Sequence, residues 1–312
     1  SIIRYSSHHG ILLNGSSNPS IGSPSEGNLI VQNWSYGIYS ATTAPYPAIY
    51  GNTISGNGSY SIRVGAVMRV QGNTLLNNGV QAIEVMGQEI LGNTTWRNEG
   101  VPYAVLGDIT VRHSEYAPAS DYLNWGRLAT LTIEPGVEVR FNPGTGLYIG
   151  KVRDNNWDWW GALKAQGTAE APIIFTSNAP SPAPGDWKGI YFNNYIDDAT
   201  TILQHCVVEY GGHTHSASLY ILNASPTIRN CLIEDSSGNG ISIVGSSSPT
   251  VTSSTVQYSA GHRIYMSGDC SPVIGGAGVG NLVSHNAGAG IYSADALGNP
   301  NISYNTISDN GS

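Results

Sequence analysis

The sequence predicts an all-β solenoid, a right-handed parallel β-helix with coils of about 20 to 27 residues and little or no α-helix. Three observations favour this fold class. A frame of polar and apolar residues recurs at the length of one coil, small polar residues separate short β-branched runs, and a much longer repeat relates the two ends of the chain.

The recurring frame combines asparagine with apolar residues at fixed spacing. Its copies read GNLIVQNWSYGI from Gly27, GNTISGNGSYSI from Gly51, GNTLLNNGVQAI from Gly72 and GNLVSHNAGAGI from Gly280. Such runs are typical of short strands and turns. A coil of this length holds three short strands and leaves no room for a crossover helix. Because one coil cannot bury its own apolar face, we expect stacked coils that share one core.

Two polar columns are expected where equivalent residues of neighbouring coils stack. Side-chain amides in such columns hydrogen-bond from coil to coil, as in cross-β ladders, so the sequon asparagines at Asn33, Asn57 and Asn310 should be buried. The column that leads each frame is Ser1, Asn28, Asn52, Asn73, Asn93, Cys206, Cys231, Ser254, Asn281 and Asn305. The column five residues further on includes Asn33, Asn57, Asn78, Asn98, Asn286 and Asn310.

The sequence also contains a second repeat that is much longer than one coil. Residues 1–59 and 254–312 align without a gap at an offset of 253, and 27 of the 59 aligned pairs are identical. We therefore predict one continuous solenoid in which residues 1–104 close one unit and residues 105–312 open the next. Residues 112–130 break the frame and are expected to form the unit boundary or a lateral excursion. The chain is then an excerpt of a longer tandem array.

Composition and charge exclude several classes of function. The net charge is −8 and the pI is about 5.4, which argues against binding to nucleic acid or to an anionic membrane, because both need basic faces. No run of apolar residues is long enough to span a bilayer. The 39 glycines and the many Ser, Thr and Asn residues weaken helices.

The middle of the chain carries a different pattern, LTIEPGVEVRF from Leu131, GALKAQGTAEAPIIFTS from Gly161 and GDWKGIYF from Gly185. This segment resembles the opening of secreted right-handed β-helix repeat proteins of the pectin-lyase-like fold group, and the resemblance extends over nearly the whole chain. It implies an extracellular or cell-surface parallel β-helix. It implies no single activity, because the fold group hosts lyases, hydrolases, isomerases, binding proteins and inert shafts.

An acidic spot is a candidate site in the stacked columns. Glu209 and Glu234 take equivalent places in neighbouring coils, Asp235 follows, and His213 and His215 lie close in sequence. Such groups suit metal binding or acid–base hydrolysis of a glycosidic bond. The alternative, which we favour, is a solvated face with incidental carboxylates.

A lyase of the pectate-lyase kind would need several aspartates that hold calcium and a basic proton acceptor. Arg4, Arg97 and Arg229 are not expected to converge on the acidic spot. This departure from the pattern weakens the lyase interpretation.

The segment DNNWDWWG suggests a calcium loop, because Asp154, Asn156 and Asp158 alternate as oxygen ligands do at the start of such loops. Trp159 stands where the loop would need glycine, and no glutamate follows at the twelfth position. The alternative is an ordinary polar loop. Calcium is the one cofactor that the sequence suggests.

The same segment holds Trp157, Trp159 and Trp160. Aromatic side chains on a loop stack on sugar rings or dock a neighbouring chain. The alternative is an aromatic plug that covers the edge of the solenoid where the frame is interrupted. We leave both interpretations open.

Cys206 and Cys231 share the leading column on adjacent coils, at a separation that permits a disulfide. We favour the alternative of two small buried thiols. Three cysteines are too few for a disulfide framework.

The function that these observations favour is a structural repeat of an extracellular or cell-surface protein: a shaft, sheath or filament element built for stacking and adhesion. Its partners would be further copies, head to tail or laterally. The alternative is a β-helix that binds or cleaves polysaccharide through Trp157–Trp160 or through Glu209, Glu234 and Asp235. A trimeric viral tail fibre is a third possibility. A structural role is favoured over an enzymatic one.

Overall fold

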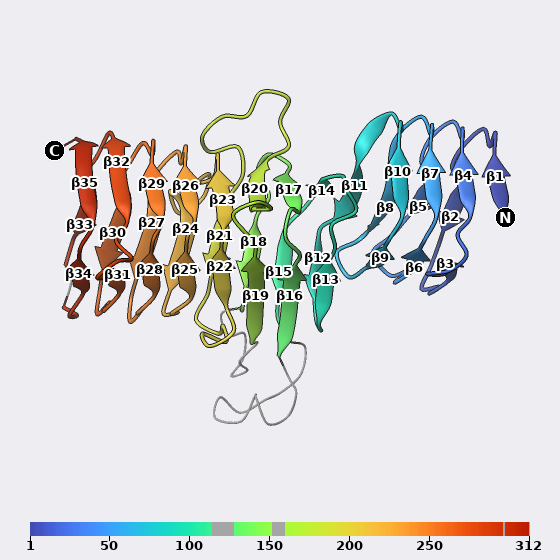
Figure 1. Ribbon diagram of the computed structural model, residues 1–312. Coiled ribbons are helices and arrows are strands. Elements are labelled where there is room, and N and C mark those ends of the chain that lie inside the picture. Colours follow the sequence, from blue (N-terminus) through green and yellow to red (C-terminus); the bar gives the residue numbers. More distant parts are fainter. Residues whose placement is uncertain (114–127, 152–159, 296, 312) are drawn as a thin grey trace.

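The computed structural model describes residues 1–113, 128–151, 160–295 and 297–311, and it confirms the right-handed parallel β-helix. All elements of the described residues are strands, and the strands pair in parallel (Figure 1). Most coils contribute three strands, one to each side of the rod. This arrangement builds one rod with the two ends of the chain at its opposite ends (Figure 1).

Every coil contributes one strand to an uninterrupted 12-stranded sheet, here called sheet B. It runs from near the start of the chain to its last described strand. Its strands are β2 (Ile11–Leu13), β5 (Ile38–Ser40), β8 (Tyr60–Gly65), β11 (Val80–Met86), β14 (Tyr103–Val105), β17 (Glu138–Phe141), β20 (Ile173–Ser177), β23 (Cys206–Glu209), β26 (Leu232–Glu234), β29 (Thr255–Gln257), β32 (Leu282–Asn286) and β35 (Thr306–Asn310).

Two further sheets, A and E, belong to different halves of the rod. Sheet A lies in the N-terminal half and consists of β1 (Ile2–Arg4), β4 (Leu29–Val31), β7 (Thr53–Ser55) and β10 (Thr74–Leu76). Sheet E lies in the rest of the rod and consists of β13 (Thr94–Trp96), β16 (Ala129–Ile133), β19 (Gly161–Gln166), β22 (Ile202–Gln204), β25 (Thr227–Arg229), β28 (Thr250–Thr252), β31 (Val273–Gly275) and β34 (Asn301–Ser303).

The remaining strands are also divided between the two halves. Sheet C consists of β3 (Ser20–Gly22), β6 (Ala48–Tyr50) and β9 (Arg69–Gln71). Sheet D follows with β12 (Gln88–Ile90), β15 (Ile109–Val111), β18 (Leu147–Ile149), β21 (Ile190–Phe192), β24 (Ala217–Leu222), β27 (Asn239–Val244), β30 (Ile264–Ser267) and β33 (Ile291–Ser293). These changes form a seam in the rod. Strand β13 of sheet E stacks on β9 of sheet C, and sheet B continues without a break in its pairing while it passes to the side of the rod that sheet A occupies in the N-terminal coils (Figure 1).

The indole of Trp96 fills the seam. It is 1% exposed, it stacks on Tyr103 at 5.3 Å between ring centroids, and its Nε1 donates to the carbonyl of Ala66 at 3.0 Å. Trp96 belongs to β13, the first strand of sheet E, whereas Ala66 follows β8 in an earlier coil. A large side chain therefore joins coils on the two sides of the seam.

The polar columns form the predicted ladder in the first coils. Asn52 is fully buried, and its Oδ1 accepts hydrogen bonds from the backbone N and the Nδ2 of Asn28 at 2.9 and 3.0 Å. Its Nδ2 donates to Asn73 Oδ1 at 3.0 Å and to the carbonyl of Ile21 at 2.8 Å. Asn57 makes equivalent bonds in the second column. Each amide satisfies backbone groups of the turns as well as its neighbour.

The ladder ends earlier than the sequence frame predicts, and the prediction for Asn93 and Asn98 is wrong. Both side chains are exposed. The carboxylate of Glu99 closes the leading column instead, because it accepts hydrogen bonds from the backbone N and the Nδ2 of Asn73 at 2.8 and 3.1 Å. Gln81 Oε1 closes the second column at the backbone N of Asn78, 2.8 Å away. Both ends lie at the seam.

The leading column also changes sheet between the two halves, which the frame alone did not predict. Asn28 precedes a strand of sheet A, whereas its copy Asn281 precedes a strand of sheet B. The reason is the coil at the seam, which contributes four strands, β10 to β13, before β13 stacks on β9 of sheet C. The 28 strands between β1 and its copy β29 are therefore nine whole coils, one of which has four strands. Equivalent strands belong to different sheets but keep the same side of the rod (Figure 1).

Aromatic pairs show that the copies keep the same local packing despite this change of sheet. His9 stacks on Tyr39 with 4.2 Å between ring centroids and 2° between planes. Their copies at an offset of 253, His262 and Tyr292, stack at 4.3 Å and 4°. These histidines belong to the repeated packing of the unit.

The buried cysteines are thiols, as favoured from the sequence. Cys206 and Cys231 are free, and each Sγ donates to backbone carbonyls at 3.2 to 3.5 Å. Burial raises the pKa of the Cys206 thiol. Cys270 is also free and buried, so it is enclosed by the coil and not displayed on the surface.

Candidate functional site

The acidic spot lies beside a groove on the outer face of sheet B. Strand register places Arg140, Thr176, Glu209 and Glu234 in one column across β17, β20, β23 and β26. The groove has a volume of about 440 Å³. We call it the acidic groove; it is lined by Glu138, Arg140, Thr176, Ser177, Asn178, Ala179, Pro180, Pro182, Glu209 and Tyr210.

Glu209 is the most perturbed carboxyl of the acidic groove. Burial raises its pKa above the usual value of 4.5, the hydrogen bond from Thr176 opposes this shift, and the negative charges of Glu234, Asp235 and Glu138 add to it. Thr176 Oγ1 donates to Glu209 Oε1 at 2.7 Å. A half-buried carboxyl with a raised pKa is suited to hold a proton that a solvated carboxyl would lose.

Glu234 and Asp235, the other members of the acidic spot, have different surroundings. Glu234 Oε2 accepts a hydrogen bond from Gln257 Nε2 at 2.8 Å. Burial and then the charge of Glu234 raise the pKa of Asp235. The structure therefore brings Glu209, Glu234 and Asp235 together as neighbours.

The two histidines near Glu209 in sequence make their contacts elsewhere. His213 is exposed, and its Nδ1 lies 3.3 Å from Thr214 Oγ1. His215 stacks on Tyr220 with 4.6 Å between ring centroids. The described part of the chain contains no group of three or more His, Cys, Asp or Glu residues arranged to hold a metal ion.

A loop between β20 and β21 forms one wall of the acidic groove and rises above the rod (Figure 1). Asp186 ties its ends together, because its carboxylate accepts hydrogen bonds from Ser177 Oγ at 2.6 Å and from the backbone N of Ala183 at 3.0 Å. Trp187 follows the loop, is fully buried and donates from Nε1 to the carbonyl of Glu209 at 2.7 Å. The loop and the strand that carries Glu209 are thus fixed to each other.

Arg140 is the residue of this groove that sequence reasoning missed. Its Nε donates to Glu138 Oε1 at 2.6 Å. Arg4, Arg97 and Arg229 have other partners, namely Tyr5, Glu134 and Gln204. The signal for Arg140 was its place in the register, two strands of sheet B before Glu209, and the break in the frame near residue 112 hid that register.

The other candidate residues lie largely outside the described residues. This holds for Trp157 and Trp159 of the aromatic loop and for the calcium candidates Asp154, Asn156 and Asp158. Trp160 is described: its ring meets Tyr195 edge to face at 5.7 Å. Its carbonyl accepts a hydrogen bond from the backbone N of His113 at 2.9 Å. Trp160 is half-buried on the rod.

Comparison with protein families decides the broader relationship. The family described as right handed beta helix region matches residues 1–114 and 187–312, about three quarters of the chain. The chain belongs to the right-handed β-helix family. Neither a curated protein nor a solved structure gives a significant match. Within the described residues no helix is long and apolar enough to cross a membrane.

Membership of the right-handed β-helix family agrees with the coils on both sides of the unmatched interval. Residues 115–186 fall between the two matched ranges. They include β16, β17, β18, β19 and β20, which continue the sheets of the rod in parallel register. The unmatched interval also contributes most of the acidic groove, so the groove is a feature of this chain that the family match does not cover.

Proposed function

We propose that this β-helix is a structural repeat of an extracellular or cell-surface protein, a shaft element that is extended by further coils stacked head to tail. The supporting observation is a core surface left open at the last coil. Ile302 and Ile307 are 41% and 49% exposed, whereas their copies Ile49 and Ile54 are fully buried under the following coil. A further coil would bury the same apolar area again.

The source of that coil is either the next unit of the same solenoid or a second copy of the chain. Sheet B offers β2 and β35 as its edge strands, and an open strand edge is a template for pairing. Low charge favours such contacts, because only 11% of the residues are charged. Head-to-tail stacking would extend the rod without widening it.

Sedimentation velocity over a concentration series tests this proposal on the 312-residue protein. We expect the sedimentation coefficient to rise with concentration, and Ile307→Lys to abolish the rise by placing a charge on the open core. Leu297→Lys is the matched control, because Leu297 is 82% exposed in a turn outside the strands. A protein that stays monomeric at high concentration, or equal behaviour of the two variants, would contradict the proposal.

A second candidate function is supported by the acidic groove. Glu209, with its raised pKa, and the pair of Glu138 and Arg140 line one depression on the rod. These groups suit binding or cleavage of a polysaccharide, and calcium held by Asp154, Asn156 and Asp158 would be its cofactor.

A screen of acidic and neutral glycans, with and without calcium, separates this candidate from the structural role. Loss of binding in Glu209→Gln or in Trp159→Ala would support it and would place the ligand on the groove or on the aromatic loop. The absence of both binding and new reducing ends would rule it out.

A further inference from the structure

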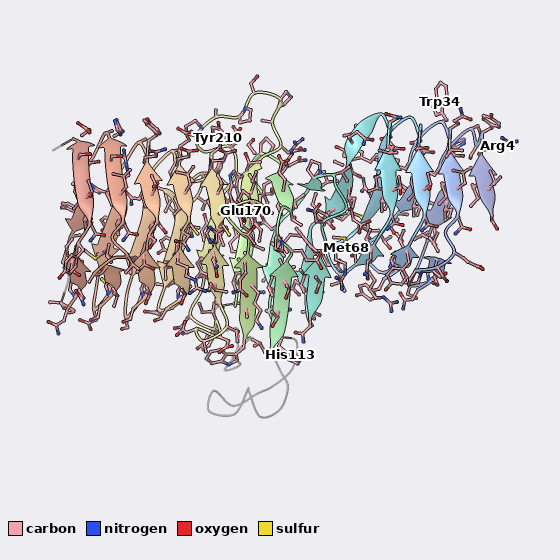
Figure 2. The ribbon with its side chains drawn as sticks, viewed as in Figure 1. Arg4, Trp34, Met68, His113, Glu170 and Tyr210 are labelled. Atoms are coloured by element: carbon pink, nitrogen blue, oxygen red, sulfur yellow. The ribbon has the colours of Figure 1, made fainter. Side chains whose placement is uncertain are left out.

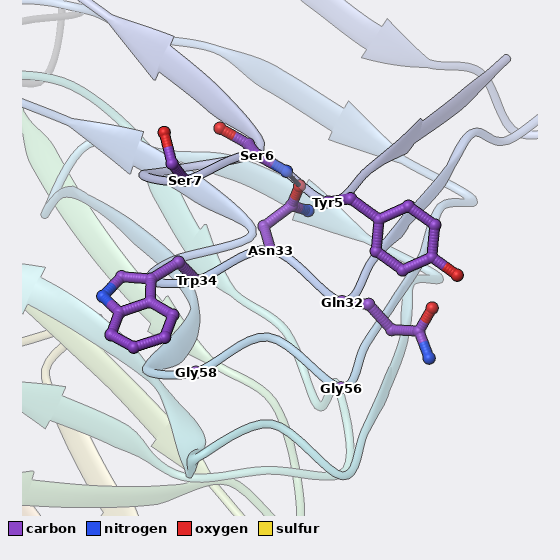
Figure 3. A pocket seen from close by; sticks show the side chains of 8 residues that line it. All are labelled: Tyr5, Ser6, Ser7, Gln32, Asn33, Trp34, Gly56 and Gly58. Carbon is purple, nitrogen blue, oxygen red and sulfur yellow. Dashed lines mark hydrogen bonds between the residues drawn. The ribbon is translucent and has the colours of Figure 1, made fainter.

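A second groove lies at the N-terminal end of the rod, between the turns that join sheet A to sheet B. It has a volume of about 630 Å³. Figure 3 shows the indole of Trp34 and the phenol of Tyr5 on opposite sides of it, with Gln32 beside Tyr5. We call it the aromatic groove; it is lined by Tyr5, Ser6, Ser7, Gln32, Asn33, Trp34, Gly56 and Gly58.

Two large aromatic side chains of the aromatic groove are displayed to solvent. Trp34 is 81% exposed and Tyr5 is 67% exposed, and Figure 2 shows Trp34 at the outer rim of the N-terminal coils. Tyrosine and tryptophan side chains have a large apolar face and lose little conformational entropy on binding. Their exposure on a fixed turn therefore favours a ligand with an apolar face of its own.

The backbone that carries these residues is held in an unusual conformation. Tyr5 and Gln32 have φ values of 61° and 56°, in the left-handed region that favours glycine, and Gly56 occupies the same place of the next coil at 65°. The same turn position also has positive φ at Asn77, Tyr210 and Tyr258 in other coils, so the conformation is a regular feature of this turn. The conformation directs the Tyr5 and Gln32 side chains outward, one coil apart.

The third coil contributes only the glycines Gly56 and Gly58 to the aromatic groove. A Cβ atom at Gly58 would lie 2.1 Å from the carbonyl oxygen of Trp34, so no larger residue fits. Gly56 likewise contributes no side chain below Gln32. Gly56 and Gly58 therefore keep this part of the groove free of side chains.

The polar groups of the aromatic groove are neutral and partly available. Asn33 is fixed, because its Nδ2 donates to Asn57 Oδ1 at 2.8 Å and its Oδ1 accepts from the backbone N of Ser6 at 3.1 Å. The carboxamide of Gln32 is exposed and makes no hydrogen bond within the part of the chain that the structure describes. It offers one acceptor and two donor hydrogens to a ligand.

The copy of this region at an offset of 253 shows which features are particular to the aromatic groove. Tyr258 is the copy of Tyr5, but Trp34 is replaced by Ala287 and Gln32 by His285. Tyr258 has a coil on each side and is still 51% exposed. A coil stacked in front of Tyr5 would therefore leave this position accessible.

We propose that the aromatic groove binds a neutral saccharide, with Trp34 and Tyr5 against the C–H faces of the sugar rings and the Gln32 carboxamide bonded to ring hydroxyls. Charge complementarity selects this ligand class, because the lining contains no carboxylate, lysine or arginine. The nearest cation, Arg4, lies over the Tyr5 ring at 5.1 Å from its centroid and leaves the other ring face open. This proposal does not rest on the shaft function or on the acidic groove.

Titration of the 312-residue protein with neutral oligosaccharides tests the proposal. The probes are hexasaccharides of β-1,4-linked glucose, mannose and xylose, with an oligogalacturonate as the acidic comparison, followed by calorimetry and by tryptophan fluorescence. We expect one neutral series to bind, to shift the fluorescence, and to bind equally well at high salt, because no ion pair is involved. Trp34→Ala, which reproduces Ala287, should weaken binding by at least about tenfold.

Two further variants make the result specific. Gln32→Ala should weaken the same binding without a change in fold. Tyr304→Ala is the matched control: Tyr304 is 74% exposed and also has a positive φ, but it lies at the other end of the rod, so binding should be unchanged.

Three outcomes would overturn the proposal. They are the absence of binding by all neutral probes, binding that Trp34→Ala leaves unchanged, and a preference for the acidic probe that is lost at high salt. If Trp34→Ala instead dissociates a dimer in the absence of sugar, the groove is an interface with a second copy. Each of these outcomes leaves the head-to-tail stacking of the rod untouched.

Discussion

At the scale of single residues, the asparagine ladder determines which polar groups can be buried inside the turns. Asn57 is 1% exposed, and its carboxamide satisfies Asn33, Asn78 and the carbonyl of Ile30. Removing one amide from this ladder leaves hydrogen-bond donors and acceptors without partners in two neighbouring coils. An orphaned buried polar group is more costly than the loss of one exposed hydrogen bond.

Asn57→Ala should therefore lower the free energy of unfolding by about 2 to 4 kcal/mol. Urea unfolding followed by circular dichroism measures this change. Asn98→Ala is the matched control, because Asn98 has the same place in the sequence frame but is exposed, and we expect a change below about 1 kcal/mol. Equal losses in the two variants would mean that the ladder is not the source of stability.

The surroundings of Glu209 in the acidic groove lead to a second prediction, which concerns how the stability of the fold depends on pH. The pKa of Glu209 is raised in the folded protein, so the folded state binds more protons than the unfolded state above the usual pKa of 4.5. Stability contributed by the protonated carboxyl is therefore present at low pH and is lost as the pH rises through the folded pKa. Glu209→Gln removes this titration.

We expect the urea midpoint of the wild type to fall relative to that of Glu209→Gln as the pH rises from about 4.5. The measurement is a set of urea titrations of both proteins between acidic and neutral pH. Parallel pH profiles would show that Glu209 is not perturbed in the way its surroundings indicate.

Only part of the asparagine ladder and of the acidic groove could be predicted from the sequence. The ladder at Asn28, Asn52 and Asn73 was predictable, because spacing within one frame fixes which residues stack. Its end at Glu99 was not, because a carboxylate reached the column from outside the frame. Arg140 was missed for the related reason that register across an interrupted frame is set by pairing between distant strands.

At the scale of elements, the seam is the feature that distinguishes this rod from a uniform solenoid. Sheets A and C end and sheets E and D begin there, while sheet B continues. Strand β11 has a register irregularity between Val80 and Ile83, where it pairs with β8. The short strands themselves were predictable from their β-branched runs. The seam was not, because the local sequence of a strand does not state which neighbour it joins.

Trp96→Ala should weaken the seam more than any other part of the rod. Loss of a fully buried tryptophan costs about 3 to 5 kcal/mol, and here the loss falls between the N-terminal coils and the rest. We expect hydrogen exchange to speed up first in β1 to β10, with β23 to β35 less affected.

Trp34→Ala is the control for this experiment, because it removes the same side chain from an exposed position. It should leave exchange rates unchanged along the rod. A uniform increase of exchange in Trp96→Ala would contradict a local role for the seam.

At the scale of the whole molecule, the repeat of 253 residues corresponds to nine coils. The coil at the seam has four strands, so equivalent sequence belongs to sheet A in one half and to sheet B in the other while it keeps the same side of the rod. The number of residues in a repeat does not state how many strands it forms, which is why this change of sheet could not be predicted.

Small-angle X-ray scattering over a concentration series tests the central claim, a rigid rod that grows by end-to-end stacking. Sheet B holds 12 strands, which at about 4.8 Å per strand predicts a single rod of at least about 50 Å at low concentration. With rising concentration the length should increase while the radius of the cross-section stays constant. Two separate lobes at low concentration, a widening cross-section, or no growth at all would contradict the account.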